Sequence, residues 1–208
     1  MLQNRVDPFG AIIRTSARGS WMGNRGVLHD AHQTLLRPFR LKAWITCQLE
    51  FKGKKRKVMT PGRWTELFFL DEATAFAAGH RPCFECRRKD ATAFKSFWVK
   101  GNPEYNFGEK TPIQEIDTIL HNERIDRHLT KITFEERVAA LPNGSFVVYD
   151  NHPFLVLNGF IFQWTPFGYE KGIPVPRVDE ITVLTPRSIV NTFRAGYLPQ
   201  MAGAGSPL

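Results

Sequence analysis

Residues 68–90 read FFLDEATAFAAGHRPCFECRRKD and hold two of the chain's three cysteines. Cys83 and Cys86 stand two residues apart, a spacing that lets two thiolates reach one metal ion. Before them, Asp71 suits the N-cap of a helix, the alanine-rich run favours helix, and Gly79 suits the left-handed position that ends one. The stretch therefore predicts an aromatic strand, a short helix and a cysteine-bearing turn.

A redox-active cysteine pair is the alternative reading of this motif. Redox chemistry expects a strand before the pair and a helix that opens at its first cysteine, whereas here a predicted helix comes first and Pro82 directly precedes Cys83. Three cysteines make no disulfide framework. The chain also lacks a long apolar run and a basic, then apolar, N-terminus. These features favour a metal site in a cytoplasmic protein without membrane association.

The order of motifs also carries a family resemblance. An aromatic pair precedes the alanine-rich helix, which leads into AGHRPCFECR at 78–87. In order and composition, residues 67–90 resemble the zinc-binding half-domain of the Ada DNA-repair methyltransferase, and the rest of the chain resembles an uncharacterised family of bacterial proteins. The resemblance implies that Cys83 and Cys86 bind zinc. It also implies a role in DNA repair or DNA processing.

The resemblance further implies two ligands from an upstream strand and turn. Cys47, in WITCQLEF, is the only upstream cysteine and becomes the expected third ligand. No second ligand stands close to it, which departs from the family pattern and argues against methyl transfer to Cys47. The fourth ligand is then sought among His29, His32 and His80. We favour His29, because a neighbouring carboxylate, Asp30, suits orientation of a ligating imidazole.

The net charge of +8 is concentrated in one segment. Residues 34–63 hold nine basic residues and one acid, and the rest of the chain is balanced. A strand over 43–51 and a return strand from Val58–Met59 would place KGKKRK (52–57) at a hairpin tip. Such a field attracts polyanions, although a solvated turn is the plain alternative. We expect contacts with nucleic acid, DNA rather than RNA, from Lys52, Lys54, Lys55, Arg56, Lys57, Arg63, Arg87 and Arg88.

Periodicity and turn signals predict an α+β protein. A small zinc-stabilised unit of β-hairpin and helix, within a region 1–100, is followed over 101–198 by helices and a C-terminal antiparallel β-meander, and 199–208 is expected to be a disordered tail. Capping patterns predict helices from Thr111 and from Thr133, the second ending at Pro142. Asn158–Gly159 predicts a tight turn between two strands of the meander.

A polar cluster late in one predicted helix suggests catalysis. HNERIDRH (121–128) contains His121, Glu123 and Arg124, and on a helix His128 would share a face with the first and last of these. Histidine, carboxylate and arginine together can act as base, acid and phosphate clamp. An ordinary solvated helix is the alternative. The glycine-flanked loop with Asn24, Arg25, His29 and Asp30 is a second polar group, but it matches no catalytic motif.

Two functions follow from these patterns. The first is a zinc-stabilised protein that binds DNA through the basic hairpin. The second is a hydrolase acting on DNA or nucleotides, similar to a nuclease or glycosylase, in which zinc is structural and the His121 helix lines the site. The sequence leaves open whether the protein is an enzyme. A protein-interaction role for the meander also stays open.

Overall fold

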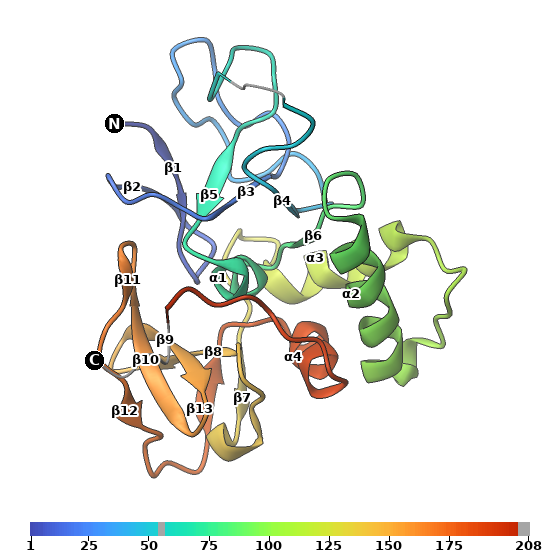
Figure 1. Cartoon of the computed structure of the whole chain (residues 1–208), viewed down its shortest axis with the longest axis vertical. Helices are drawn as coiled ribbons and strands as arrows, with labels where there is room; N and C mark the ends of the chain where they lie inside the picture. The colour runs from blue at the N-terminus through green and yellow to red at the C-terminus, as the bar shows by residue number, and fades with distance from the viewer. Residues whose placement is uncertain (54–56, 204–208) are drawn as a thin grey trace.

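The computed structural model describes residues 1–53 and 57–203 and confirms the α+β class (Figure 1). The N-terminal sheet has six strands in the order β2-β1-β5-β3-β4-β6. Their bounds are β1 (Gln3–Val6), β2 (Ile12–Arg14), β3 (Trp21–Asn24), β4 (Ile45–Cys47), β5 (Leu67–Phe69) and β6 (Arg81–Pro82). The sheet is mixed, because the pairs β1–β5 and β4–β6 are parallel.

The C-terminal sheet is antiparallel throughout its described pairs and contains the predicted meander. Its order is β11-β10-β9-β8-β13-β7, and β12 pairs with β10. The turn at Asn158–Gly159 has φ values of +51° and +80°, as the sequence predicts. The strands are β7 (Phe134–Glu136), β8 (Phe146–Tyr149), β9 (His152–Leu157), β10 (Phe160–Thr165), β11 (Gly168–Tyr169), β12 (Ile173–Pro174) and β13 (Ile181–Val183).

Four α-helices accompany the two sheets in the described ranges. They are α1 (Glu72–Ala77), α2 (Arg88–Gly101), α3 (Ile113–Arg124) and α4 (Arg187–Arg194), and short 3-10 turns occupy Pro103–Tyr105 and Val138–Ala140. The predicted start and end of α1 are confirmed: Asp71 accepts hydrogen bonds from the amide and hydroxyl of Thr74, and Gly79 has a φ of +83°. None of the described helices is long and apolar enough to cross a lipid bilayer.

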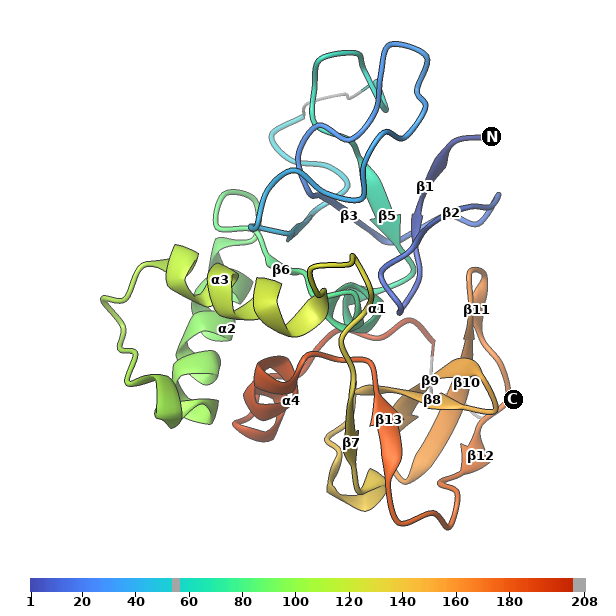
Figure 2. The ribbon, with the colours of Figure 1, turned by 180° about the vertical axis from the view of Figure 1, so that it is seen from behind.

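Helix α1 lies between the two sheets (Figures 1 and 2). All six of its residues are buried. Ala75 packs in a cluster with the N-terminal sheet, Ala77 packs with the C-terminal sheet, and Phe76 packs with the other helices. A helix covered on every side needs small side chains where neighbours approach closely. This explains the alanine-rich sequence of the segment.

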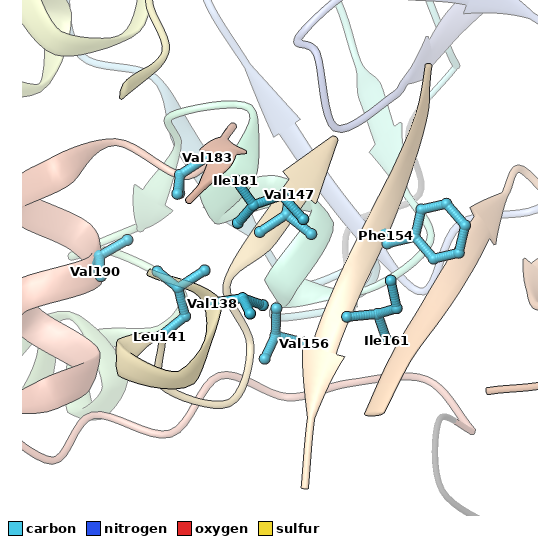
Figure 3. Packing of buried hydrophobic residues seen from close by; sticks show 9 residues of the cluster. All are labelled: Val138, Leu141, Val147, Phe154, Val156, Ile161, Ile181, Val183 and Val190. Carbon is cyan, nitrogen blue, oxygen red and sulfur yellow. The ribbon is translucent and has the colours of Figure 1, made fainter. Parts of the chain in front are cut away.

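The halves of the chain share their cores. The helical core joins Phe94 and Trp98 of α2 to Leu120 of α3 and Ile189 of α4. A second core lies between the C-terminal sheet, α4 and the 138–140 turn, and contains Val138, Leu141, Val147, Phe154, Val156, Ile161, Ile181, Val183 and Val190 (Figure 3). The loop after α2 is held in place as well, since the side-chain amide of Asn102 donates to the carbonyl of Ser188 at 3.0 Å.

Three local predictions are wrong. β4 pairs with β3 and β6 rather than with 58–59, so it forms no hairpin with that segment. The expected helix from Thr133 is instead strand β7, which pairs with β13, because tertiary pairing outweighs a capping pattern in so short a segment. Thr111 does not cap α3: its hydroxyl accepts from Gly108, and the N-cap is Pro112.

The expected disordered tail is wrong over its described part. The amide of Gln200 donates to Glu72 at 2.9 Å, and the amide of Ala202 donates to Asp71 at 2.9 Å. Both acceptors belong to the start of the buried helix α1, so residues 199–202 cover this end of the helix. The remaining tail residues, 204–208, lie outside the described residues.

Candidate metal centre and basic loops

Strand register brings the three cysteines together. β4 and β6 run parallel with Thr46 opposite Pro82, and the amide of Cys83 donates to the carbonyl of Thr46 at 2.9 Å. This pairing sets Cys47, at the end of β4, beside the turn that carries Cys83 and Cys86. The three sulfur atoms lie within 4.8 Å of one another. The ligands that were expected from distant parts of the sequence therefore form one cluster.

The cluster favours negative charge on two of its three sulfur atoms, those of Cys83 and Cys86. A hydrogen bond from the Cys47 thiol, first of all, lowers the pKa of Cys83 to about 5 and also lowers that of Cys86. The same bonds, together with burial, raise the pKa of Cys47. Backbone amides add to the effect, as the amide of Glu85 donates to Cys83 Sγ at 3.4 Å and that of Gln48 donates to Cys86. A metal cation that replaces the proton of the Cys47 thiol would hold all three sulfurs as thiolates.

The donor set fits a soft or borderline divalent metal ion. A tetrahedral ion with metal–sulfur bonds of about 2.3 Å places its sulfur ligands about 3.8 Å apart, which falls within the 4.8 Å limit that the three sulfurs here satisfy. Cys47 and Cys83 are buried, and Met22, Trp64 and Phe68 pack around the sulfurs. Among the described residues, the cluster contains no fourth histidine, cysteine or carboxylate ligand. The three cysteines can therefore bind a metal ion with one position left for another donor.

His29, the favoured fourth ligand, lies elsewhere. Its Nδ1 is 2.6 Å from the hydroxyl of Thr65 and its Nε2 is 3.3 Å from the carbonyl of Thr60. The other two histidines are also outside the cluster: His32 is exposed, and His80 is buried against Trp44. The choice of His29 is corrected here, because this side chain ties two loops together instead.

The basic segment forms two adjoining loops rather than a hairpin. We call 25–44 the first basic loop and the described residues 48–53 and 57–66 the second basic loop. Besides the His29 contacts, the amide of Leu28 donates to Thr65 Oγ1 at 2.9 Å. Both loops lie at the same end of the molecule (Figures 1 and 2). Their exposed cations are Arg37, Arg40, Lys42, Lys52, Lys57 and Arg63. Lys54, Lys55 and Arg56, also predicted to bind nucleic acid, lie outside the described residues.

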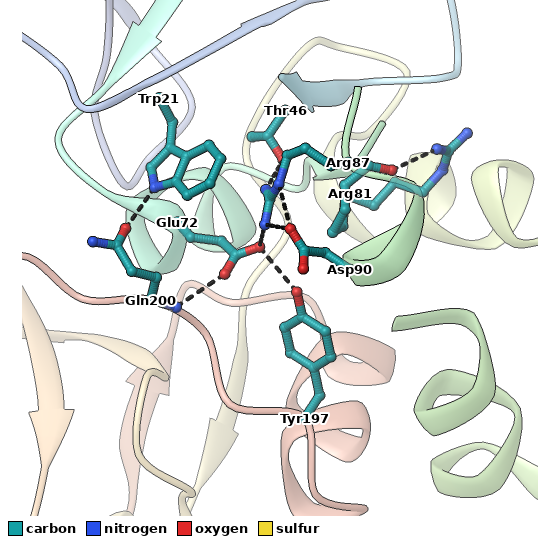
Figure 4. A network of polar contacts seen from close by, with 9 residues as sticks. Trp21, Thr46, Glu72, Arg81, Arg87, Asp90, Tyr197 and Gln200 are labelled. Carbon is teal, nitrogen blue, oxygen red and sulfur yellow. Dashed lines mark hydrogen bonds and ion pairs between the residues drawn. The ribbon is translucent and has the colours of Figure 1, made fainter. Parts of the chain in front are cut away.

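Arg87 and Arg88 have different environments. Arg88 is exposed. Arg87 is buried and forms ion pairs with Glu72 and Asp90, donates to Thr46 Oγ1 at 3.0 Å, and lies 3.9 Å from the centre of the Trp21 ring (Figure 4). The guanidinium of Arg87 is thus engaged in contacts inside the protein. The expectation that Arg87 contacts phosphate is corrected: it joins α2 to α1.

The predicted catalytic group does not converge on one site. Glu123 Oε2 accepts from the amide and the hydroxyl of Ser188, in the first turn of α4. Arg124 is buried and donates to the carbonyls of Gly79 and Lys42, and to His121 Nδ1 at 3.0 Å. Burial, followed by the charge of Arg124, lowers the pKa of His121 to about 4. His128 lies beyond the end of α3, so the predicted shared helix face is wrong.

One constellation was not predicted from the sequence. Arg25 and Arg124 both lie over the ring of Trp44, at 3.7 and 3.9 Å from its centre. Arg25 belongs to the glycine-flanked loop and Arg124 to the α3 cluster, each noted separately in the sequence. The two arginines come together in the fold because both pack on the buried ring of Trp44, which lies 19 residues after Arg25 and 80 residues before Arg124.

Comparison with known proteins does not extend this picture. No family model, curated protein or solved structure matches the chain. The class of protein is therefore set by the fold and the site alone: an α+β protein with a cluster of three cysteines able to bind a metal ion. The resemblance to the Ada half-domain stays a prediction.

Proposed function

We propose that the protein binds one zinc ion through Cys47, Cys83 and Cys86 and binds nucleic acid, DNA rather than RNA, through its two basic loops, in DNA repair or processing. One observation carries the proposal. The described part of the segment that holds the chain's whole excess of positive charge belongs to two loops in mutual contact, and the second of these loops starts directly after Cys47.

Zinc is proposed on the chemistry of the donors. Three thiolates suit zinc, which also accepts water or an anion as its fourth ligand. All three cysteines are free thiols, as a reducing cytoplasm would keep them. When bound, zinc would fasten the end of β4 to the turn before α2. Because the amide of Gln48 donates to Cys86, the same centre would also fix the start of the second basic loop.

Nucleic-acid binding is proposed on charge and exposure. The six exposed cations of the two loops have no acidic partner among the ion pairs of the described residues. Lysine and arginine side chains of this kind contact phosphates regardless of base sequence, and their binding weakens steeply with salt because counterions are released. The loops therefore suit the backbone of a strand rather than the edges of its bases.

Fluorescence anisotropy with labelled duplex and single-stranded DNA, at several salt concentrations, tests the proposal. A variant with Lys52→Ala, Lys57→Ala and Arg63→Ala should bind more weakly and show a shallower salt dependence, by roughly 0.9 in the logarithmic slope for each lost phosphate contact. The matched control removes three exposed charges elsewhere, with Lys110→Ala, Lys171→Ala and Arg177→Ala. Equal loss of affinity in the control, or no binding by the wild type at low salt, would contradict the loop assignment.

A further inference from the structure

A pocket with a volume of about 540 Å³ lies at the edge of the N-terminal sheet, away from the cysteine cluster. Its wall comes from three parts of the chain: the β1–β2 turn, the first basic loop and the segment after α3. The lining includes Gly10, Ile12, Leu36, Trp44 and Leu129. Its volume is within the range typical of small-molecule sites.

Four cations line this wall: Arg25, Arg37, Arg124 and Lys131. Arg37 lies at the surface, whereas Arg25 and Arg124 are only 1% and 2% exposed. Arg25 donates to the carbonyl of Gly10 at 2.9 Å, and Lys131 donates to the carbonyl of Ala77 at 2.5 Å. These carbonyls hold the cations in place, but they do not neutralise them.

The other buried arginines of the described chain give an internal comparison. Arg81 forms a bidentate ion pair with Asp117. Arg87 forms an ion pair with Glu72 (Figure 4). Arg25 and Arg124 are equally buried, yet neither takes part in an ion pair of the described residues. Burying a charge without a direct partner is energetically unfavourable. Among the described residues, the fold thus gives two buried arginines an ion-pair partner and gives none to the two at the pocket.

The two pocket arginines also lack some of the hydrogen bonds that their guanidiniums could form. Within the described residues, Nη2 of Arg25 and Nε of Arg124 are buried without a hydrogen-bond partner. The ring of Trp44 lies under both guanidiniums, an interaction that lowers but does not cancel the cost of their burial. The charge of Asp7 acts on Arg25 and Lys131, and that of Asp117, which is already paired with Arg81, acts on Arg124. The described lining of the pocket holds cations and no carboxylate, so its charge is positive.

We propose that this pocket binds a phosphate monoester, with its phosphoryl group held by Arg25, Arg124 and Lys131 and its organic part against Leu36 and Leu129. Guanidiniums match the oxygens of a phosphoryl group in geometry, and a dianion matches the net charge better than a single carboxylate. The two leucines, 59% and 54% exposed, supply an apolar rim that inorganic phosphate alone would not use. This site is independent of the zinc centre.

Isothermal titration calorimetry of the full chain tests the site with AMP, inorganic phosphate and adenosine. AMP should bind more tightly than phosphate, and adenosine should bind at least tenfold more weakly than AMP.

Lys131→Gln should weaken AMP binding about tenfold, the usual effect of losing one charge-assisted hydrogen bond. Asp7→Asn should tighten AMP roughly threefold, because it removes the opposing charge. Arg40→Ala, an exposed arginine of the same loop outside the pocket, is the control and should leave affinity unchanged.

A second pair of probes distinguishes the end of a nucleic-acid strand from a free monoester as the source of the phosphate. A 5′-phosphorylated oligonucleotide that binds more tightly than its 5′-hydroxyl counterpart, with a difference lost in Lys131→Gln, would show that the pocket takes a nucleic-acid end; equal binding of the two would assign it to free monoesters such as AMP. The proposal is overturned if AMP binds no better than adenosine, or if neither Lys131→Gln nor Asp7→Asn changes its affinity. The triple-alanine loop variant leaves the pocket intact, so failure of the DNA proposal would remain distinct.

Discussion

At the scale of the residue, Gly79 determines how closely α3 approaches the end of α1. Its φ is +83°, and a Cβ atom there would lie 2.5 Å from Cδ of Arg124. The carbonyl of the same glycine accepts from Arg124 at 2.8 Å. Gly79 therefore combines a left-handed turn with the close approach that buries one of the pocket arginines.

Gly79→Ala should destabilise the protein by about 2–4 kcal/mol, because left-handed backbone is strained for alanine and the added methyl overlaps Arg124. Gly108→Ala is the control, since no heavy atom lies within 4 Å of a Cβ at this exposed position. Urea unfolding of both variants measures the difference. A Gly79→Ala protein as stable as the control would show that the approach of Arg124 is not constrained.

Lys131 gives the pocket a pH dependence. Burial first, then the charges of Arg124 and Arg25, lowers its pKa to about 7, while Asp7 acts in the opposite direction. Burial also lowers the pKa values of the nearby His80 and His121, that of His121 to about 4, so both shift away from the range in which Lys131 titrates. Lys131 is therefore protonated below about pH 7 and loses its charge above it.

Sulfate, a dianion throughout this range, should bind the pocket more tightly at pH 6 than at pH 8. Calorimetric titration at both values measures the change, and Lys131→Gln should remove most of it. Asp7, whose pKa is raised by burial, shifts binding in the same direction on acidification, so the variant is needed to isolate Lys131. Wild-type affinity that stays constant across the range would contradict this role.

The residues of the metal centre differ in how far the sequence predicts them. Cys83 and Cys86 are evident from spacing within one turn. Cys47 was expected from the family resemblance, and its place depends on the pairing of β4 with β6. The contact between His29 and Thr65 joins residues 36 positions apart, and no local pattern in the sequence indicates it.

At the scale of the element, local signals succeed where an element is bounded by its own caps. Helix α1 begins and ends where Asp71 and Gly79 predict. The meander follows from its turn at Asn158–Gly159. By contrast, the capping pattern at Thr133 fails because β13 pairs with this segment. Strand β4 pairs with β3, the preceding strand, and with β6, and not with the segment that directly follows it.

The close packing around α1 predicts the result of enlarging one of its alanines. Ala77 is fully buried and packs in a cluster with Phe146 and Leu155. Ala77→Leu should cost about 1–3 kcal/mol through overpacking. Ser96→Leu places the same side chain at an exposed position of α2 and should change stability by no more than about 0.5 kcal/mol. Equal thermal unfolding of the two variants would show that α1 has room on this side.

At the scale of the whole molecule, one segment connects both halves. The stretch 68–90 supplies strand β5, helix α1 and two of the three cysteines, and Glu72 accepts from both Arg87 and Tyr197 (Figure 4). Composition alone indicated the basic character of the loops, but not that Thr65 and His29 would join them. Long-range contacts of this kind bring the two basic loops together.

The zinc content of the purified protein tests the central claim most directly. Native mass spectrometry before and after chelation, with Cys83→Ser alongside, measures the metal bound per chain. We predict one zinc per wild-type chain, none in the variant, and a lower melting temperature once zinc is removed. A wild type without stoichiometric zinc, together with a Cys83→Ser protein that melts unchanged, would contradict the account.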